Sequence, residues 1–298
     1  MKSGFIALIG RPNAGKSTLL NALLQHKIAI ISPKAQTTRN AIRGILTNED
    51  SQLIYVDTPG IHKPQHKLGG VLNKTALQES RGVDLIYLLV DATQPFGSGD
   101  EYILQHLNNI KMPTFLILNK TDLLSREQVM KMILLYKDKY PFTEIFPLSA
   151  LKNNDFSTLI EKTTELMPEG PLYYPSDQHT DYPEQFIISE IIREKILYLT
   201  KEEVPHSIAV IIERMGRKKD NLLINAMIIV ERDSQKGIII GKQGSMLKEI
   251  GQRARIELQE ILGSKIYLEL FVRVEKNWRN KMSKLNELGL VEIENLDE

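Results

Sequence analysis

The glycine-rich segment between residues 10 and 17 constrains the fold of this chain more than any other feature. It reads Gly10-Arg-Pro-Asn-Ala-Gly-Lys-Ser17, which matches the pattern Gly-x-x-x-x-Gly-Lys-Ser/Thr. An apolar run, residues 5–9, precedes it, and a segment expected to be helical, residues 16–25, overlaps its end. Such a loop turns backbone N–H groups toward a phosphate, and the helix adds a favourable dipole. The segment therefore predicts a phosphate-binding loop in which Lys16 contacts phosphates and Ser17 binds Mg²⁺.

Apolar and amphipathic segments alternate through the first two-thirds of the chain. The expected strands cover residues 5–9, 53–57, 85–91 and 114–119, and the expected helices cover residues 16–25, 100–109, 127–139, 156–167 and a segment that ends near Ser80. Residues 41–47 and 51–57 flank Asn48-Glu-Asp50, which is typical of a hairpin. The pattern predicts an α/β fold with a doubly wound, mostly parallel sheet that carries helices on both faces.

A proline-rich stretch interrupts this alternation. Four prolines and one glycine lie between residues 168 and 183. We therefore expect a first domain over residues 1–168, a linker over 169–183 and a second domain over 184–298. The second domain is expected to contain a helix at 184–199, strands at 207–214 and 222–231, a glycine-rich turn, a helix at 245–262 and a strand at 265–274. This order predicts a smaller domain of the α+β class.

Composition excludes several classes of protein. The longest apolar runs, such as residues 222–230, are shorter than the roughly 18 residues of a membrane-spanning helix. With no cysteine, the chain has no disulfide framework and no thiolate zinc site, which is compatible with a reducing cytoplasm. The formal net charge is only +1, but residues 201–286 hold 17 Lys or Arg against 11 Asp or Glu, and the last twelve residues hold five acids and no base. The second domain is therefore expected to be basic and to end in an acidic tail.

A second motif, Asp57-Thr-Pro-Gly60, ends the next expected strand. An acid at the carboxyl edge of a parallel sheet, beside the phosphate loop, is placed to hold Mg²⁺ through water. The Gly60 N–H is placed to contact a γ-phosphate, so the segment after it is a candidate switch.

A third motif, Asn119-Lys-Thr-Asp122, follows another strand and predicts the base. The Asp122 carboxylate can accept the N1–H and 2-amino hydrogens of guanine, whereas adenine offers neither donor. The stem of Lys120 is expected along the base, and Ser149-Ala-Leu151 completes the pocket, with the Ala150 N–H donating to the guanine oxygen.

Between the phosphate loop and the hairpin lies the candidate first switch, which comprises Gln36, Thr37, Thr38, Arg39 and Asn40. A threonine here is expected to bind Mg²⁺ and the γ-phosphate, and Thr38 is preferred over Thr37.

The residue after Gly60 is Ile61, where well-studied switch GTPases carry the glutamine that orients water. The sequence therefore predicts either slow hydrolysis or another water-positioning element. We hypothesise that the Asn13 amide oxygen holds a monovalent cation, K⁺, near the phosphates.

The complete set of motifs resembles the Era family, within the translation-factor-related class of bacterial GTPases. Pro168-Glu-Gly-Pro-Leu-Tyr-Tyr-Pro-Ser-Asp177, Glu190-Ile-Ile-Arg-Glu-Lys195 and Glu203-Val-Pro-His-Ser-Ile-Ala-Val210 resemble that family's linker and C-terminal domain. The resemblance implies an N-terminal GTPase domain and a C-terminal type II KH domain. Its expected GTP-binding residues are Gly10, Arg11, Pro12, Asn13, Ala14, Gly15, Lys16, Ser17, Thr18, Asp57, Thr58, Pro59, Gly60, Ile61, Asn119, Lys120, Thr121, Asp122, Ser149 and Ala150. Lys16, Thr38 and Gly60 are expected to serve catalysis.

The turn Gly241-Lys-Gln-Gly244 resembles the KH loop that clamps single-stranded RNA by its backbone. The apolar positions of the following helix fall at helical spacing. The expected RNA contacts are Gly241, Lys242, Gln243, Gly244, Arg253, Lys218 and Lys219.

The resemblance implies a Mg²⁺-dependent GTPase that binds GTP and GDP and acts on 16S ribosomal RNA near its 3′ end, in 16S processing and biogenesis of the 30S subunit. It further implies a cytoplasmic protein with peripheral association at the cytoplasmic face of the cell membrane, and a monomer is the default expectation. Two alternatives stay open. One is an RNA-binding assembly module that uses GTP only as a structural ligand, and the other is a GTPase whose basic domain binds acidic lipid or protein partners.

Overall fold

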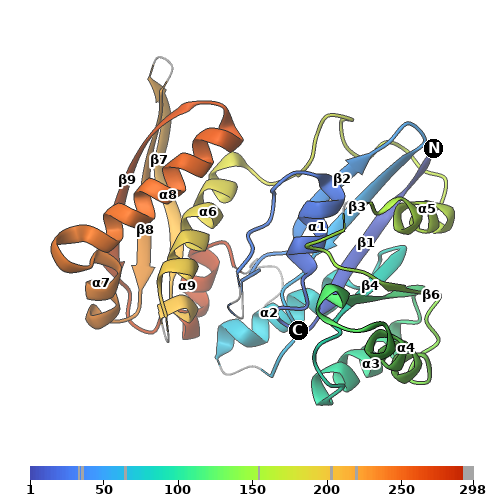
Figure 1. The fold of residues 1–298 in the computed structure, drawn as a ribbon. Helices are drawn as coiled ribbons and strands as arrows, with labels where there is room; N and C mark the ends of the chain where they lie inside the picture. The colour runs from blue at the N-terminus through green and yellow to red at the C-terminus, as the bar shows by residue number, and fades with distance from the viewer. Residues whose placement is uncertain are drawn as a thin grey trace. The chain divides into compact units, whose positions relative to one another are not determined.

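A computed structural model of the protein describes residues 1–32, 34, 37–63, 66–153, 155–201, 204–218 and 221–290. The chain divides into two compact units, the first built from residues up to Asp181 and the second mainly from Tyr182 onward (Figure 1). Two of the expected site residues, Gln36 and Lys219, lie outside the described residues, as does the end of the acidic tail at 291–298. No helix in the described part of the chain combines the length and apolarity that crossing a bilayer requires.

The first unit contains a six-stranded sheet in the order β2-β3-β1-β4-β5-β6. Its strands are β1 (Lys2–Gly10), β2 (Ile42–Thr47), β3 (Ser51–Asp57), β4 (Leu85–Asp91), β5 (Thr114–Asn119) and β6 (Glu144–Pro147). All neighbouring strands pair in parallel except β2, which forms the expected antiparallel hairpin with β3. The central strands are buried on both faces, which explains their nearly continuous runs of Ile, Leu and Val.

Helices cover both faces of this sheet, as the alternation predicts (Figure 1). They are α1 (Lys16–Leu24), α2 (Lys67–Glu79), α3 (Ser98–Ile110), α4 (Arg126–Lys137) and α5 (Ser157–Leu166), with the 3-10 turn η1 at Thr121–Leu123. Side chains of α2, α3 and α4 pack with one sheet face in a single apolar cluster that includes Leu107, Leu118 and Tyr136. On the other face, the Tyr87 hydroxyl hydrogen-bonds Thr163 of α5. The doubly wound α/β fold is confirmed.

The parallel strands end together at one edge of the sheet. Asp57 at the end of β3 pairs with Leu8 of β1, and Leu8 is two residues before Gly10. Asp91 at the end of β4 pairs with Asn119 at the end of β5. This arrangement gathers the ends of β1, β3, β4 and β5 and the loops that follow them. Ligands of open α/β sheets bind at this carboxyl edge.

Residues 173–181, which we call the strap, run along the hairpin of the first unit. The strap contains no helix and only an isolated β-bridge, from Thr180 to Gly44. Its contacts include the bond from the Ile45 N–H to the His179 oxygen (2.9 Å), the ion pair of Arg43 with Asp181 (3.0 Å) and the stacked rings of His26 and His179. Most of the stretch expected to be a linker is therefore attached to the edge of the first sheet.

The second unit has a three-stranded sheet in the order β7-β8-β9, with β7 antiparallel and β9 parallel to the central β8. Its elements are α6 (Glu184–Leu199), η2 (Val204–His206), β7 (Ala209–Lys218), β8 (Asn221–Val230), α7 (Asp233–Ile240), η3 (Lys242–Gly244), α8 (Ser245–Leu262), β9 (Lys265–Val274), η4 (Trp278–Asn280) and α9 (Met282–Glu287). This order of elements confirms the smaller α+β domain that the sequence predicts.

The helix α7 is a difference from expectation, because the sequence predicts only a glycine-rich turn before α8. The Gln235 side-chain oxygen accepts the N–H groups of Glu231 and Arg232 (2.9 and 3.1 Å) and so starts the helix. Ile239 is fully buried, and its packing offsets the poor helix propensity of Gly237.

Candidate nucleotide and RNA sites

Three expected Mg²⁺ ligands meet beside the phosphate loop. The Ser17 hydroxyl donates to the Asp57 carboxylate (2.6 Å), and the Thr38 hydroxyl lies 2.9 Å from Ser17 and 3.3 Å from the same carboxylate oxygen. Asp57 ends β3, Ser17 opens α1, and Thr38 comes from the loop before β2. The structure thus places the preferred threonine, Thr38, in this cluster.

Burial changes the ionisation of the two charged groups in this site. It raises the pKa of Asp57 to about 6, although the Lys16 ammonium and hydrogen bonds from Ser17 and Thr38 act in the opposite direction. Burial also lowers the pKa of Lys16 to about 8, against the attraction of Asp57. The Lys16 ammonium donates long, weak bonds to the Gly10 and Arg11 carbonyls (3.3 and 3.2 Å). Both groups are therefore charged at a cost that a bound cation and phosphates would reduce.

The donors at this site suit Mg²⁺. The second Asp57 oxygen is buried and has no hydrogen-bond partner among the residues that the structure describes. A hard dication prefers carboxylate and hydroxyl oxygens, usually with several waters retained. The cluster of Ser17, Thr38 and Asp57 supplies these ligand types, so these residues would hold the ion.

Gly60 lies directly against the phosphate loop. A Cβ atom at Gly60 would lie 2.8 Å from both the Cα and the nitrogen of Pro12, so only glycine allows this approach. The next residue, Ile61, donates its N–H to the Gly10 carbonyl (3.1 Å) and buries its side chain in the core with Ala7 and Ile9. The Ile61 side chain is therefore unable to orient an attacking water.

Asn119 joins the three loops of the expected base pocket. Its amide donates to the Ala14 carbonyl (2.8 Å), and its oxygen accepts the N–H groups of Lys120 (2.8 Å) and Ala150 (2.9 Å). The expected donation from Ala150 to a guanine oxygen would therefore require this bond to be shared or exchanged. Asp122 is exposed in η1, where its carboxylate is accessible to a base.

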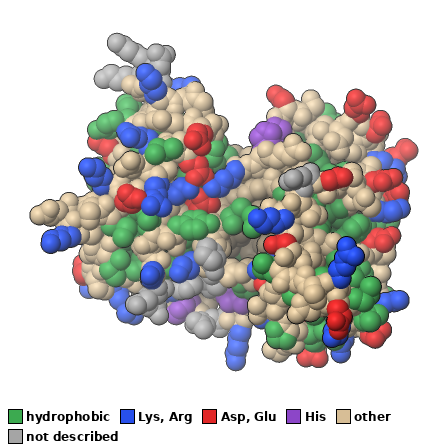
Figure 2. Space-filling view, in the orientation of Figure 1, with side chains coloured by type: hydrophobic (Ala, Val, Ile, Leu, Met, Phe, Trp, Pro, Cys, Tyr) green, Lys and Arg blue, Asp and Glu red, His purple; other side chains and the backbone are tan. Residues whose placement is uncertain are grey.

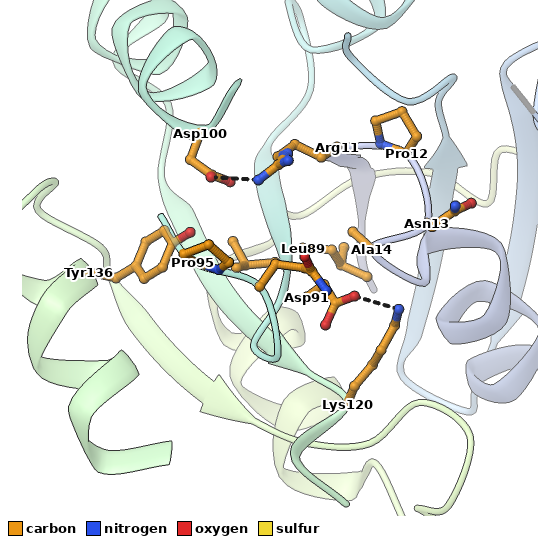
Figure 3. Close-up of a pocket in the computed structure, with 12 residues that line it drawn as sticks. Arg11, Pro12, Asn13, Ala14, Leu89, Asp91, Pro95, Asp100, Lys120 and Tyr136 are labelled. Carbon is orange, nitrogen blue, oxygen red and sulfur yellow. Dashed lines mark hydrogen bonds and ion pairs between the residues drawn. The ribbon is translucent and has the colours of Figure 1, made fainter. Parts of the chain in front are cut away.

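A cavity of about 330 Å³ adjoins the phosphate loop and is drawn in Figure 3. Lys120 pairs with Asp91 (2.6 Å) on one side of it, and Arg11 pairs with Asp100 (3.0 Å) on the other. Burial tends to raise the pKa of Asp91, but hydrogen bonds from Lys120 and Thr93 lower it overall. The two ion pairs tie the motif loops to the ends of β4 and α3.

Other expected site residues have structural partners. The Thr58 hydroxyl donates to the Leu8 carbonyl (2.7 Å) and is fully buried, so the Thr58 side chain supports the sheet. Arg39 is buried and Asn13 is exposed, the latter with a positive φ of 62°. Pro59, Thr121 and Ser149 lie in the expected motif loops, and Thr18 lies in the first turn of α1.

The loop at residues 241–244 opens α8 in the manner that backbone binding requires. Gly241, Gln243 and Gly244 all have positive φ values, of 71°, 54° and 80°. A Cβ atom at Gly241 would lie 2.8 Å from the Met246 nitrogen, so this turn needs glycine. No side chain in the described part of the chain caps the first turn of α8, and Lys242 is exposed beside it. The Ser245 N–H donates to the Lys242 carbonyl, and the N–H groups that follow in this turn are positioned to bind an anion.

A groove follows this loop between α8 and the edge strand β9. It has a volume of about 410 Å³ and is lined by apolar groups of Leu247, Leu268 and Leu270 together with Lys248 and Arg255. Gly251 also lines the groove and has no side chain to fill it. A Cβ atom added at Gly251 would lie 3.4 Å from the Leu270 side chain. Figure 2 shows Lys and Arg side chains spread over this unit, with hydrophobic groups between them. An apolar groove beside a backbone anion site is suited to bases whose phosphates lie at the loop.

Three further residues, Arg253, Lys218 and Lys219, are expected to contact RNA. The Arg253 side chain points along α8 and pairs with Glu249 (2.7 Å). Lys218 ends β7, and Lys219 lies outside the described residues.

The sequence reasoning missed Asp91 and Asp100 of the nucleotide site and Leu268 and Leu270 of the groove. Asp91 offers a usable signal, since it ends a strand at the carboxyl edge of the sheet as Asp57 does.

Comparisons with known proteins match both units of the chain. The model of the 50S ribosome-binding GTPase family matches residues 5–120, and the KH domain model matches residues 203–279. A variant of Aquifex aeolicus Era bound to GDP and AlF4⁻ is 41% identical, with a TM-score of 0.94 and coverage of 98% of this chain and 100% of that chain. Era in complex with MgGDPNP and nucleotides 1506–1542 of 16S ribosomal RNA has the same identity and coverage and a TM-score of 0.95. With a phosphate-loop site in one unit and a KH loop in the other, the chain belongs to the Era family of GTPases.

Proposed function

We propose that this protein is a Mg²⁺-dependent, GTP-hydrolysing switch that binds 16S ribosomal RNA near its 3′ end. In this proposal it acts in 16S processing and 30S biogenesis, as a cytoplasmic monomer with peripheral contact to the membrane. The observation that carries the proposal is the match over 98% of the chain to an Era that holds MgGDPNP and nucleotides 1506–1542 of 16S ribosomal RNA. The RNA part is further supported by the glycine loop and apolar groove of the KH unit.

The nucleotide part of the proposal assigns roles to residues in the observed cluster. Lys16 neutralises phosphate charge, and the Gly60 N–H senses the γ-phosphate at the place where it packs on the phosphate loop. Mg²⁺, held by Ser17, Thr38 and water on Asp57, would supply further neutralisation of the phosphates. Asp122 reads guanine. Replacing Asp122 with Asn should shift the preference from GTP toward xanthosine triphosphate in competition binding, and an unchanged preference would contradict the pocket.

Hydrolysis without the usual glutamine needs another source of stabilisation. We propose K⁺ held by Asn13 near the phosphates, a role supported by the exposure of Asn13 in the phosphate loop and by the burial of the Ile61 side chain. Equal GTP turnover in potassium and sodium buffers would rule out this ion, as would an Asn13→Ala variant with unchanged potassium dependence.

The test of the whole proposal combines RNA binding and turnover. Single-stranded fragments of 16S RNA should bind with an affinity that falls steeply with salt, because phosphate contacts release counterions. The double change Lys242→Glu and Gln243→Glu should abolish this binding and leave GTP affinity unchanged. Lys16→Ala should abolish GTP turnover and leave RNA binding intact. Unchanged RNA affinity in the loop variant would refute the KH assignment.

The burial of Ile61 favours a second candidate, in which GTP is a structural ligand of an RNA-binding assembly module. The two functions differ in their turnover with RNA. Turnover that RNA stimulates, and that disappears in Lys16→Ala, would exclude the structural role. Binding of GTP without turnover in the presence of RNA and potassium would support it.

A further inference from the structure

The sheet of the KH unit has one face away from the helices. The helices α6 and α8 cover the other face (Figure 1). The even positions of β8, such as Ile224 and Ala226, are fully buried and so lie on the covered face, together with their β9 partners such as Leu268. The opposite face carries the odd-numbered residues of β8 and β9 and the β7 residues that pair with them. Its cross-strand rows are Gly216–Leu223–Tyr267, Arg214–Asn225–Glu269 and Ile211–Met227–Phe271.

Two aromatic side chains on this second face are exposed. Tyr267 is 57% exposed and Phe271 is 46% exposed, although aromatic side chains usually lie in cores or interfaces. Leu223 and Met227, their neighbours on β8, are only half-buried. Aromatic rings that stand on an open sheet are the usual platform for stacking unpaired bases, and every base offers a face for this contact.

This face is continuous with the groove already assigned to RNA. Tyr267 lines that groove together with Leu268 and Leu270, and it also stands on the open face because β9 is the edge strand. A KH loop and its groove clamp about four nucleotides. An RNA strand longer than this that leaves the groove across β9 therefore meets Tyr267 first and then Phe271.

The charges on the face favour bases over a continuous track of phosphates. Glu269 lies between the two aromatic residues, where the Tyr267 hydroxyl donates to it (3.3 Å). Its carboxylate would repel a phosphate but can accept hydrogen bonds from base amino groups. Arg214, in the same row, is exposed and is a cation that a flanking phosphate could contact, whereas Arg273 already pairs with Glu275.

We propose that Tyr267 and Phe271 form a second RNA subsite, which stacks bases of the strand that continues beyond the KH groove. The subsite rests on the proposed RNA-binding function and extends it from the four-nucleotide groove to the outer face of the sheet. Its ligand is unpaired RNA with bases present, and the contact is stacking rather than charge.

The experiment compares three RNA ligands by fluorescence anisotropy. The first is the shortest single-stranded fragment of the 16S 3′ region that binds the full-length protein. The second is that fragment extended by four nucleotides at either end, and the third carries the same extension with abasic sites. We expect the extension to raise affinity about tenfold or more at one end, and the abasic extension to lose most of that gain.

Substitutions then test whether the gain in affinity from the extension comes from the aromatic residues on the sheet face. Phe271→Ala should reduce the gain severalfold and leave the affinity of the shortest fragment unchanged, and Phe271→Tyr should retain the gain. Tyr198→Ala is the matched control, because Tyr198 is similarly exposed (54%) but stands on α6. Because both aromatics are exposed, the variants are expected to fold, and an unchanged affinity for the shortest fragment verifies it.

The outcomes separate the two proposals. A gain of equal size in the wild type and in Phe271→Ala, or an equal gain from the abasic extension, overturns the stacking subsite while the KH groove stands. Failure of every fragment to bind overturns the RNA-binding function itself, and the subsite with it.

Discussion

Individual residues of the nucleotide site are held in a state that favours ligand binding. Asp57 and Lys16 are both buried, and burial disfavours the charged form of each. Their pKa values, about 6 and about 8, leave a window in which both are ionised without nucleotide. The site is therefore charged before the ligand binds. Ligand binding must lower the pKa of Asp57 and raise the pKa of Lys16.

The first prediction follows from the direction of these shifts. Mg²⁺ favours ionised Asp57, so binding of MgGDP should release a proton near pH 6 and weaken as the pH falls through that value. Phosphates favour charged Lys16, so binding should take up a proton near pH 8 and weaken as the pH rises through it. Calorimetry in buffers of different ionisation enthalpy measures both, and we expect about half a proton at each pH.

The control for this prediction separates proton release by the protein from proton release by the nucleotide. This is needed because the terminal phosphate of the nucleotide also titrates at about pH 6. Asp57→Asn should remove part of the release at acidic pH and keep the uptake at alkaline pH. Identical proton release by the wild type and Asp57→Asn would show that Asp57 is already ionised well below pH 6.

The second prediction concerns Gly60, whose position against Pro12 leaves no room for a side chain. Gly60→Ala should push the switch segment away from the phosphate loop and lower GTP turnover by about 10–100-fold, because small displacements are costly in catalysis. GDP affinity should change less than threefold, since it does not depend on a γ-phosphate contact. Single-turnover kinetics and GDP titration measure the two quantities.

Gly70 provides the matched control in the same chain. It lies exposed in α2, and an added Cβ there meets nothing within 4 Å. Gly70→Ala should leave turnover unchanged and raise the free energy of unfolding by roughly 0.5–1 kcal/mol through better helix propensity. Wild-type turnover in Gly60→Ala would mean that the observed packing has no role in hydrolysis.

At the scale of secondary-structure elements, the strap determines how much free chain joins the two units. Asp181 pairs with Arg43 of β2 and accepts a bond from the Tyr174 hydroxyl (3.2 Å). Because β2 follows directly after the loop that carries Thr38, the strap ends on the strand nearest the first switch. Attachment of the strap also covers part of the free edge of β2, which would otherwise be open to strand pairing.

The third prediction tests whether the Asp181 contacts hold the strap. Asp181→Ala should make residues 173–181 severalfold more sensitive to limited proteolysis, because the strap opens locally more often. The free energy of unfolding should change by about 1 kcal/mol or less, since the Arg43 and Asp181 side chains are 39% and 22% exposed. Asp177→Ala, an exposed position in the same strap, is the control. Equal cleavage of both variants would show that Asp181 does not secure the segment.

The elements that could be predicted are those with local signals. The central parallel strands and the phosphate loop were predictable because contiguous residues carry their signals, which are continuous apolar runs and the glycine spacing. The bounds of the edge strand β6 (Glu144–Pro147) were not, because this strand is short and only partly buried. The helix α7 was not, because Ile238-Ile-Ile240 is typical of a strand and the helix depends on the Gln235 cap and on tertiary burial. The Asn119 bonds to Ala14 and Ala150 and the strap contacts join residues far apart in the chain, so no short pattern reports them.

At the scale of the whole molecule, two sites of different chemistry occupy two units. The nucleotide site is built from loops at one sheet edge, and the RNA site from a helix start and an edge strand. Neither site shares a residue with the other. A switch function therefore requires a coupling free energy between them, and such coupling acts equally in both directions.

The last prediction is this reciprocity. If a GTP analogue changes the RNA dissociation constant relative to GDP by some factor, RNA must change the ratio of GTP-analogue to GDP dissociation constants by the same factor, about 5–150-fold in typical allosteric proteins. Filter binding measures the first ratio and nucleotide displacement the second. The loop variant at Lys242 and Gln243 should remove the effect of RNA on nucleotide binding and leave the affinities for free nucleotides unchanged. Equal RNA affinity in both nucleotide states would mean that the two units bind independently, since a ligand with no differential affinity shifts no equilibrium.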